Sequence, residues 1–176
     1  MPGPGPAPAD AMLLTRTYLE MTDRRAFRPE WTHTPGVVVD RISRCPAYLF
    51  RSLYAEIGRQ YGWLDRLNWT DDEIQSHLVN PAVSIWVMRV QDAPAGYFEL
   101  RTEPDGSTEL AYFGLLPEFI GQGLGKHLLS VAVEQAFERG ARRLWLHTCT
   151  LDNPAALPNY LKRGFVPFRT EIVRAR

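Results

Sequence analysis

The 176-residue sequence predicts a mixed α/β domain in which a hairpin meander leads into a parallel crossover. Three observations predict this class. Hydrophobic residues make up 45% of the chain, which is typical of a packed globular domain. Short apolar runs of strand length alternate with segments whose apolar residues recur at helical spacing. Three of the strand-like runs follow one another directly, and the longest helical segment comes after them.

Composition narrows the function classes before any motif is considered. Twenty basic residues balance twenty acidic ones, so charge gives no reason to expect nucleic acid or a membrane surface as the main partner. The only cysteines, Cys45 and Cys149, lie far apart in the sequence and form no CxxC pair. This argues against a disulfide framework or a structural zinc site and fits a reducing cytoplasm. We expect no metal site.

The organisation of the chain is simple. Residues 1–11 are rich in proline and glycine, lack the features of a signal peptide, and are predicted to be a disordered tail. Residues 12–176 are predicted to form a single domain, since no repeat or linker interrupts them. No apolar run approaches the roughly 18 residues that a membrane-spanning helix needs.

The first half of the domain predicts two strands and two helices. The strands are expected at residues 12–21 and 37–43, with an irregular segment between them. A helix then begins after Cys45-Pro46, because apolar residues recur along one face. These are Leu49, Phe50, Leu53, Tyr54, Ile57 and Tyr61. Thr70 and Glu73 have capping-box spacing at the start of the second helix, which ends at Asn80-Pro81.

The second half predicts a three-stranded meander followed by alternating helices and strands. The meander strands are expected at residues 83–90, 97–102 and 108–116, the long helix at 123–139, and the next strand at 141–150. Gly140 suits a left-handed C-cap of the long helix.

The last helix is expected to start at Asn153-Pro154, with asparagine as cap, and to run to about Arg163. Pro158 would remove a backbone hydrogen bond inside it and kink it. A final strand, FVPFRTEIV, ends the domain.

The loop GQGLGK (residues 121–126) places three glycines at the start of the long helix. A nucleotide P-loop is excluded because Ile120 stands at its first glycine position and His127 follows Lys126. A GxGxxG fingerprint is excluded because Lys126 or Leu128 stands at its last position. An anion-binding turn and a helix start that is merely glycine-rich remain. Lys126 favours the first, since a phosphate or pyrophosphate would offset its charge beside the positive helix end.

Two motifs resemble those of the GCN5-related N-acetyltransferase (GNAT) superfamily. In that family a strand ending near V-x-P is followed by (Q/R)-x-x-G-x-(G/A) and a long helix. The segment ELAYFGLLPEFIGQGLGKHLL, with Leu116-Pro117, is similar. Further on, NPAALPNYLKRGF resembles the family's N-x-x-A-x-x-x-Y-x-x-x-G-F. The matching residues are Asn153, Ala156, Tyr160, Gly164 and Phe165. The resemblance implies a mostly antiparallel central sheet flanked by helices, with the glycine loop opening the central helix.

The resemblance also implies acetyl-CoA as cosubstrate, bound by residues 105–176. Backbone N–H groups near Leu115 and Leu116 would bind the acyl carbonyl and the pantetheine arm, and those of the glycine loop would bind the pyrophosphate. The implied cofactor-binding residues are Leu115, Leu116, Gly121, Gln122, Gly123, Leu124, Gly125, Lys126 and Asn153. Ile120 departs from the family, which usually has Gln or Arg there, so backbone groups would do more of the binding.

Acyl transfer to an amine needs a base for the amine and an acid for the leaving thiolate. The resemblance assigns the acid to Tyr160 and the base to Glu109, which would act directly or through water. A carboxyl group in a mostly apolar strand would have a raised pKa, which suits a base near neutrality. The alternatives are a Tyr160 that only packs its helix and a Glu109 that faces solvent at a strand edge.

The family places the acceptor beside the two early helices, within residues 12–104. Aromatic residues there would wall an amine pocket through cation–π contact or burial, although a core position is favoured for Tyr54. These residues are Tyr54, Tyr61, Trp63 and Trp69. Tyr112 and His147 join Trp63 and Trp69 as the predicted substrate-binding residues. His147 shares a strand face with Cys149, and a hydrogen-bonded core histidine is its favoured alternative.

These observations predict a cytoplasmic N-acetyltransferase that moves an acetyl group from acetyl-CoA to a primary amine by direct attack in a ternary complex. A small-molecule acceptor is favoured because no strongly charged segment indicates docking to a large partner. We expect no nucleic acid or membrane partner, and a monomer or homodimer. The alternatives are a non-catalytic acyl-CoA-binding module and a protein N-terminal or lysine acetyltransferase.

Overall fold

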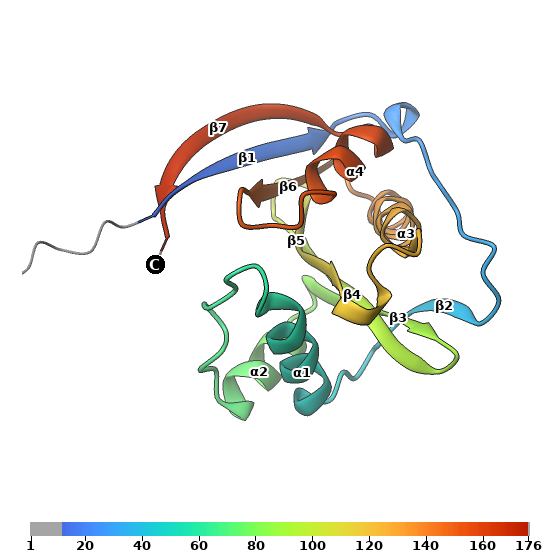
Figure 1. Ribbon diagram of the computed structural model, residues 1–176, viewed down its shortest axis with the longest axis vertical. Helices are drawn as coiled ribbons and strands as arrows, with labels where there is room; N and C mark the ends of the chain where they lie inside the picture. The colour runs from blue at the N-terminus through green and yellow to red at the C-terminus, as the bar shows by residue number, and fades with distance from the viewer. Residues whose placement is uncertain (1–11, 176) are drawn as a thin grey trace, which may run out of the picture.

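The computed structural model describes residues 12–175, so the predicted tail over residues 1–11 lies outside the described part of the chain. The elements follow the predicted order (Figure 1). The strands are β1 (Leu13–Met21), β2 (Val37–Arg41), β3 (Val83–Val90), β4 (Ala93–Thr102), β5 (Ser107–Leu115), β6 (Arg143–Cys149) and β7 (Val166–Arg174). The α-helices are α1 (Ala47–Gly58), α2 (Asp71–Leu78), α3 (Leu124–Glu138) and α4 (Ala156–Arg163). Two short 3-10 helices are η1 (Arg24–Ala26) and η2 (Pro117–Phe119).

The strands form one sheet in the order β2-β3-β4-β5-β6-β1-β7. Every neighbouring pair is antiparallel except β5 and β6, which are parallel and are joined by α3. This confirms the mostly antiparallel sheet with one parallel crossover. The first strand of the chain, β1, lies between β6 and β7, and the β1–β7 pair forms a long curved ribbon at one end of the sheet (Figure 1).

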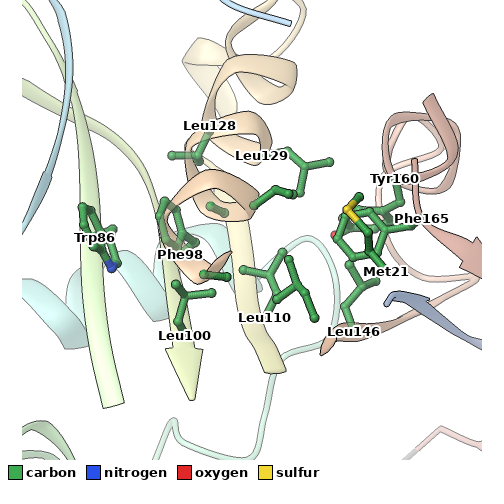
Figure 2. Packing of buried hydrophobic residues seen from close by; sticks show 14 of the residues in the cluster. Met21, Trp86, Phe98, Leu100, Leu110, Leu128, Leu129, Leu146, Tyr160 and Phe165 are labelled. Atoms are coloured by element: carbon green, nitrogen blue, oxygen red, sulfur yellow. The ribbon is translucent and has the colours of Figure 1, made fainter. Parts of the chain in front are cut away.

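Alternate residues of the sheet supply two separate cores. On β3, Trp86 and Met88 belong to the core under α3, whereas Ile85 and Val87 belong to the core under α1 and α2. Because side chains of a strand alternate between faces, α3 must cover one face of the sheet and α1 and α2 the other. Figure 2 shows the first core, with Leu128 of α3 among the side chains that pack over the sheet.

The hairpin between β3 and β4 is tighter than predicted. Gln91 and Asp92 both have positive φ, of 50° and 67°, and form a two-residue turn of the kind whose twist suits a hairpin. Consequently β4 begins at Ala93, rather than at Tyr97 as predicted. Pro94 is accommodated because β4 first pairs with β5 at Gly96.

The predicted start of the last helix is two residues too early. Asn153 does not cap α4. Its side chain accepts from the Ala155 N–H at 2.9 Å and its carbonyl accepts from the Ala156 N–H at 2.8 Å, so it shapes a turn before the helix. Because α4 begins at Ala156, Pro158 lies in its first turn, where an N–H would have no intrahelical partner. Pro158 therefore costs no hydrogen bond, and the reason for the predicted kink does not apply.

Other local predictions are confirmed. The capping box of α2 is complete, because Thr70 Oγ1 accepts from the Glu73 N–H at 3.2 Å and Glu73 Oε2 accepts from the Thr70 N–H at 2.7 Å. Gly140 has a left-handed φ of 94° just after α3. Gly164 ends α4 with a φ of 108°. These ends depend on short-range spacing, which explains why the sequence predicts them well.

Candidate active site

The parallel strands β5 and β6 diverge in the middle of the sheet. They pair only from Ser107 to Glu109, although β5 continues to Leu115 and β6 to Cys149. A cavity of about 1060 Å³ lies at this divergence. Its walls come from β5, β6, the glycine loop, α4, and the connection between α1 and α2. The cavity therefore joins the segments that the sequence assigned to the cosubstrate and to the acceptor.

A β-bulge in β5 decides which of its side chains face the same way. The register with β4 shifts at Ala111, so Glu109 pairs with Arg101 and Tyr112 pairs with Glu99. Arg101 and Glu99 are two residues apart and share one face of β4. Their partners Glu109 and Tyr112 therefore also share a face, although their odd separation would place them on opposite faces of a regular strand.

The backbone of β5 offers N–H groups to the cavity at one predicted position, Leu115, and at one that was not predicted, Phe113. The Leu116 N–H donates to the carbonyl of Ala95 at 2.8 Å, so it is not free for a ligand, and the prediction for Leu116 is wrong. Because backbone groups of an antiparallel pair alternate in direction, the N–H groups of Leu115 and Phe113 point away from β4, toward the gap left by β6. Sequence reasoning missed Phe113 because it depends on the strand register.

The glycine loop forms an open cradle at the start of α3. Gly121 and Gly123 have left-handed φ angles of 82° and 76°, which glycine adopts without strain. A Cβ at Gly121 would meet no atom within 4 Å. Within residues 12–175 the N–H groups of residues 121–126 have no recorded acceptor. Unpaired N–H groups at a positive helix end are a ready binding site for a phosphate or pyrophosphate.

Lys126 has a partner that the sequence did not reveal. Its Nζ lies 3.1 Å from Glu30 Oε1, and the Glu30 N–H donates to Ser130 Oγ at 2.9 Å, which holds this carboxylate beside α3. The positive charge of Lys126 therefore does not by itself require an external anion. The pair is half-exposed, so we expect it to contribute little to stability.

Glu109 is buried in the cavity wall. Only 6% of the residue is exposed, and its carboxylate forms an ion pair with Arg101. Burial is the largest effect on this group and raises the pKa of Glu109, although the charge of Arg101 opposes the shift. The alternative of a glutamate facing solvent at a strand edge is therefore wrong. A buried carboxylate with a raised pKa has the properties of a general base.

Tyr160 packs behind the cavity rather than in its lining. The residue is 6% exposed and packs beside Phe165 (Figure 2). Its ring centroid lies 6.1 Å from that of Phe113 and 6.0 Å from that of Phe165. Its helix neighbours Ala156 and Asn159 do line the cavity. Burial raises the pKa of the phenol, so Tyr160 is protonated over the whole physiological range.

The connection between α1 and α2 forms an aromatic wall of the cavity. Tyr61 and Trp63 line it, and the Trp63 ring lies 4.9 Å from the ring of Tyr112. Trp69 lies outside the lining, because it packs in the second core with its ring 5.2 Å from that of His77. Of the predicted substrate-binding aromatic residues, Trp63 and Tyr112 therefore lie together in the cavity wall, whereas Trp69 does not line the cavity.

His147 lies in the cavity wall and not in the core. Its side chain is exposed on β6, 5.6 Å from the ring of Tyr18, and it lines the cavity together with Cys149. The interpretation as a hydrogen-bonded core histidine is therefore wrong. The pKa of His147 is lowered, mainly because the cavity wall partly desolvates the imidazole and also because the positive charge of Arg16 is nearby.

A buried ion pair fixes the aromatic wall to the sheet. Arg66 donates from Nη1 to Glu99 Oε2 at 2.6 Å and from Nη2 to Oε1 at 3.1 Å, with the two residues 8% and 0% exposed. His77 Nε2 lies 3.0 Å from the same carboxylate. The Arg66 guanidinium also lies 4.2 Å from the ring centroid of Tyr112. Sequence reasoning missed this cluster, because no local pattern pairs Arg66 with Glu99.

Most of the predicted site residues line one cavity. Those that line it are Trp63, Glu109, Tyr112, Leu115, Gly121, Gly123, Gly125, Lys126, His147 and Asn153. Those outside the lining are Trp69, Leu116, Gln122, Leu124 and Tyr160. Gln122 and Leu124 still contribute N–H groups to the loop.

No helix in the described part of the chain is long and apolar enough to cross a membrane.

The fold and the cavity together define an α/β domain in which a helix end with unpaired N–H groups and a buried carboxylate open onto one cavity. Residues 48–165 match the family described as the acetyltransferase (GNAT) family. This match covers more than half of the chain, and the chain therefore belongs to the GNAT family.

Individual relatives are also acetyltransferases, and the chain aligns with only part of each of them. A 78-residue stretch is 35% identical to the mycothiol acetyltransferase of Jonesia denitrificans, covering 44% of this chain and 24% of that protein. A GCN5-related N-acetyltransferase structure from Kribbella flavida has a TM-score of 0.64 at 24% identity, over 90% of this chain and 56% of that one. The chain thus spans only part of the length of these relatives.

An aminoglycoside acetyltransferase from an uncultured soil metagenomic sample, in complex with sisomicin, has a TM-score of 0.62 at 12% identity. The alignment covers 73% of this chain and 88% of that one. At these identities the solved structures show the fold alone.

Proposed function

We propose that this chain is an acetyltransferase that moves an acetyl group from acetyl-CoA to a primary amine of a small molecule, by direct attack in a ternary complex. One observation carries the proposal. The unpaired N–H groups of the glycine loop and the buried carboxylate of Glu109 open onto the same cavity. An anion-binding end and a base are two of the functions that this reaction requires of the protein.

The residues present fit acetyl-CoA. The N–H groups of residues 121–126 suit its pyrophosphate, and the β5 groups of Phe113 and Leu115 suit the acyl carbonyl and the pantetheine arm. The missing Gln or Arg at Ile120 is consistent with this fit, because the loop binds through its backbone. When bound, acetyl-CoA supplies the acetyl group as a thioester.

The chain's own groups account for the proton movements. Glu109 accepts the proton that the amine loses as its nitrogen bonds to the acetyl carbon, either directly or through water. N–H groups of β5 stabilise the charge on the carbonyl oxygen. Tyr160 donates the phenol proton to the sulfur as the carbon–sulfur bond breaks. Tyr160 is protonated at working pH, as a donor must be, whereas burial of the phenol behind the cavity lining makes it a weaker acid. The support for this role is therefore the position of Tyr160 on α4, whose residues Ala156 and Asn159 line the cavity.

Replacing Gly123 by alanine should weaken CoA binding. The added Cβ would lie 3.5 Å from Lys126 Cε, in the cradle, and we expect about a 10- to 100-fold loss of affinity by calorimetry. Gly140→Ala is the matched control, because Gly140 also has a left-handed φ but meets nothing within 4 Å and lies outside the cavity. Both variants should lose a similar 1–2 kcal/mol of stability. Equal CoA affinity for the two variants would place the cosubstrate elsewhere.

Tyr160→Phe should lower kcat by about 100-fold, the lower end of what a general acid contributes, and leave CoA affinity unchanged. Phenylalanine keeps the packing against Phe113 and Phe165, and no hydrogen bond of the Tyr160 hydroxyl is recorded with the described residues. Thermal unfolding should therefore be nearly unchanged. An unaltered kcat would show that Tyr160 only packs its helix.

A thiol-release assay with a panel of primary amines tests the function as a whole. Acetylation of an amine well above hydrolysis supports the proposal. Tight CoA binding without turnover of any amine would favour a non-catalytic acyl-CoA-binding module. Turnover restricted to peptides would favour a protein N-terminal or lysine acetyltransferase.

A further inference from the structure

Asp65 presents an unpaired carboxylate to the cavity. It is exposed and lines the cavity from the connection between α1 and α2, and it forms no ion pair with residues 12–175. The other carboxylates of the lining are already used. Glu109 is paired with Arg101, and Asp152 accepts from the Cys149 N–H at 2.9 Å and from Thr148, which shapes a turn.

Two phenols hold this carboxylate in place. The Tyr54 hydroxyl donates to Asp65 Oδ1 at 3.0 Å, and the Tyr112 hydroxyl donates to Oδ2. Burial opposes ionisation, but these hydrogen bonds and the charge of Arg66 outweigh it and lower the pKa of Asp65. The group is therefore a fixed negative charge, and its rotamer is already ordered before any ligand arrives.

The surroundings of Asp65 favour a cation. The neighbouring Arg66 is engaged by Glu99 through two hydrogen bonds, so it is not a dedicated counter-ion of Asp65. The cations of the opposite walls have their own partners, since Arg16 pairs with Glu171 and Lys126 with Glu30. Arg174 also lines the cavity, from the far end of β7.

Aromatic rings complete the environment. Tyr61 and Trp63 line the cavity on the same connection as Asp65, with their ring centroids 6.3 Å apart. A carboxylate beside aromatic faces is an arrangement that binds ammonium groups, because it combines ion pairing with cation–π attraction.

We propose that the acceptor carries a second ammonium group, which binds to Asp65 beside Trp63 while the reacting amine reaches Glu109. This rests on the proposed function and names its substrate class, the primary diamines and polyamines. The geometry supports it, because the bulge places Glu109 on the same face as Tyr112, which holds Asp65. The β4 partners of Glu109 and Tyr112 are two positions apart, so the two backbone positions lie roughly 7 Å apart along the strand.

Matched pairs of amines test the inference. The probes are butylamine against putrescine and pentylamine against cadaverine, measured by calorimetry on the CoA-loaded protein and by steady-state acetylation. We expect the wild type to prefer each diamine, and Asp65→Asn to weaken diamine binding and raise its KM by about 10- to 100-fold. The monoamines should be unaffected. Asparagine is isosteric. Its oxygen still accepts from one phenol, and its NH2 group can donate to the hydroxyl oxygen of the other, so the fold should persist.

The control is Asp72→Asn, which removes an exposed charge from α2 outside the cavity and should change neither amine. Equal affinity of the wild type for mono- and diamines, or an equal loss of both in Asp65→Asn, overturns the inference while acetylation itself upholds the proposed function. If no amine is acetylated, the proposed function fails, and the calorimetric difference between diamine and monoamine still decides whether Asp65 binds an ammonium group.

Discussion

Glu109→Gln should lower kcat by about 100- to 1,000-fold, because the variant keeps the shape of the side chain and loses its ability to accept a proton. In the wild type only the carboxylate form of Glu109 accepts a proton, so activity should fall as the pH drops through the pKa of this group. Burial raises that pKa, which moves this loss to a higher pH than for an ordinary glutamate. In Glu109→Gln, the fall in activity at low pH that Glu109 causes should disappear from the pH–rate profile. Thiol-release rates measured over a pH series check both expectations.

CoA affinity and folding should be unchanged in Glu109→Gln, since the amide oxygen can still accept from Arg101 and the half-exposed Arg101 is hydrated. The matched control is Glu56→Gln, an exposed glutamate on α1 outside the cavity, which should be fully active. A Glu109→Gln enzyme with near wild-type kcat and the same low-pH limb would contradict the assignment of Glu109 as the base.

Arg66→Met should destabilise the protein by about 3–5 kcal/mol, because it leaves the fully buried carboxylate of Glu99 without its main cation. In the folded wild type, burial opposes the charge of Glu99, and His77 and Arg66 outweigh that effect and lower the pKa of Glu99. Ionised Glu99 therefore stabilises the fold fully at pH values above the pKa of a glutamate in the unfolded chain. This stabilisation is lost as the pH falls through the lower pKa that Glu99 has in the folded protein. The deficit of the variant should be largest near neutrality and should shrink in acid. Urea unfolding at several pH values measures it.

The double variant Arg66→Met/Glu99→Leu should recover most of the lost stability, because it removes both buried charges. Only His77 then lacks its partner, and its partly exposed ring can form a hydrogen bond with water instead. This comparison separates an uncompensated charge from a simple packing defect. If the double variant is as unstable as Arg66→Met alone, the Arg66–Glu99 pair is not the cause. A loss below about 1 kcal/mol in the single variant would also contradict the prediction.

The candidate site could be predicted where its residues belong to a local pattern. The glycine loop sets its own backbone geometry through Gly121 and Gly123, and the start of α3 follows from it. Glu109 and Tyr112 were also predicted, although their common orientation was not, because it depends on the bulge at Ala111. Asp65 was missed as a site residue, since its two phenol partners come from different elements.

The sequence by itself determined the order of the elements, the helix ends at Thr70 and Gly140, and the glycine loop, because each depends on residues within a few positions of one another. The tertiary structure alone decided that β1 lies between β6 and β7, that Lys126 meets Glu30, and that Arg66 is buried against Glu99. These contacts join segments far apart in the chain. Their geometry is set by strand register and by the burial of charge, which the spacing of residues along the chain does not encode.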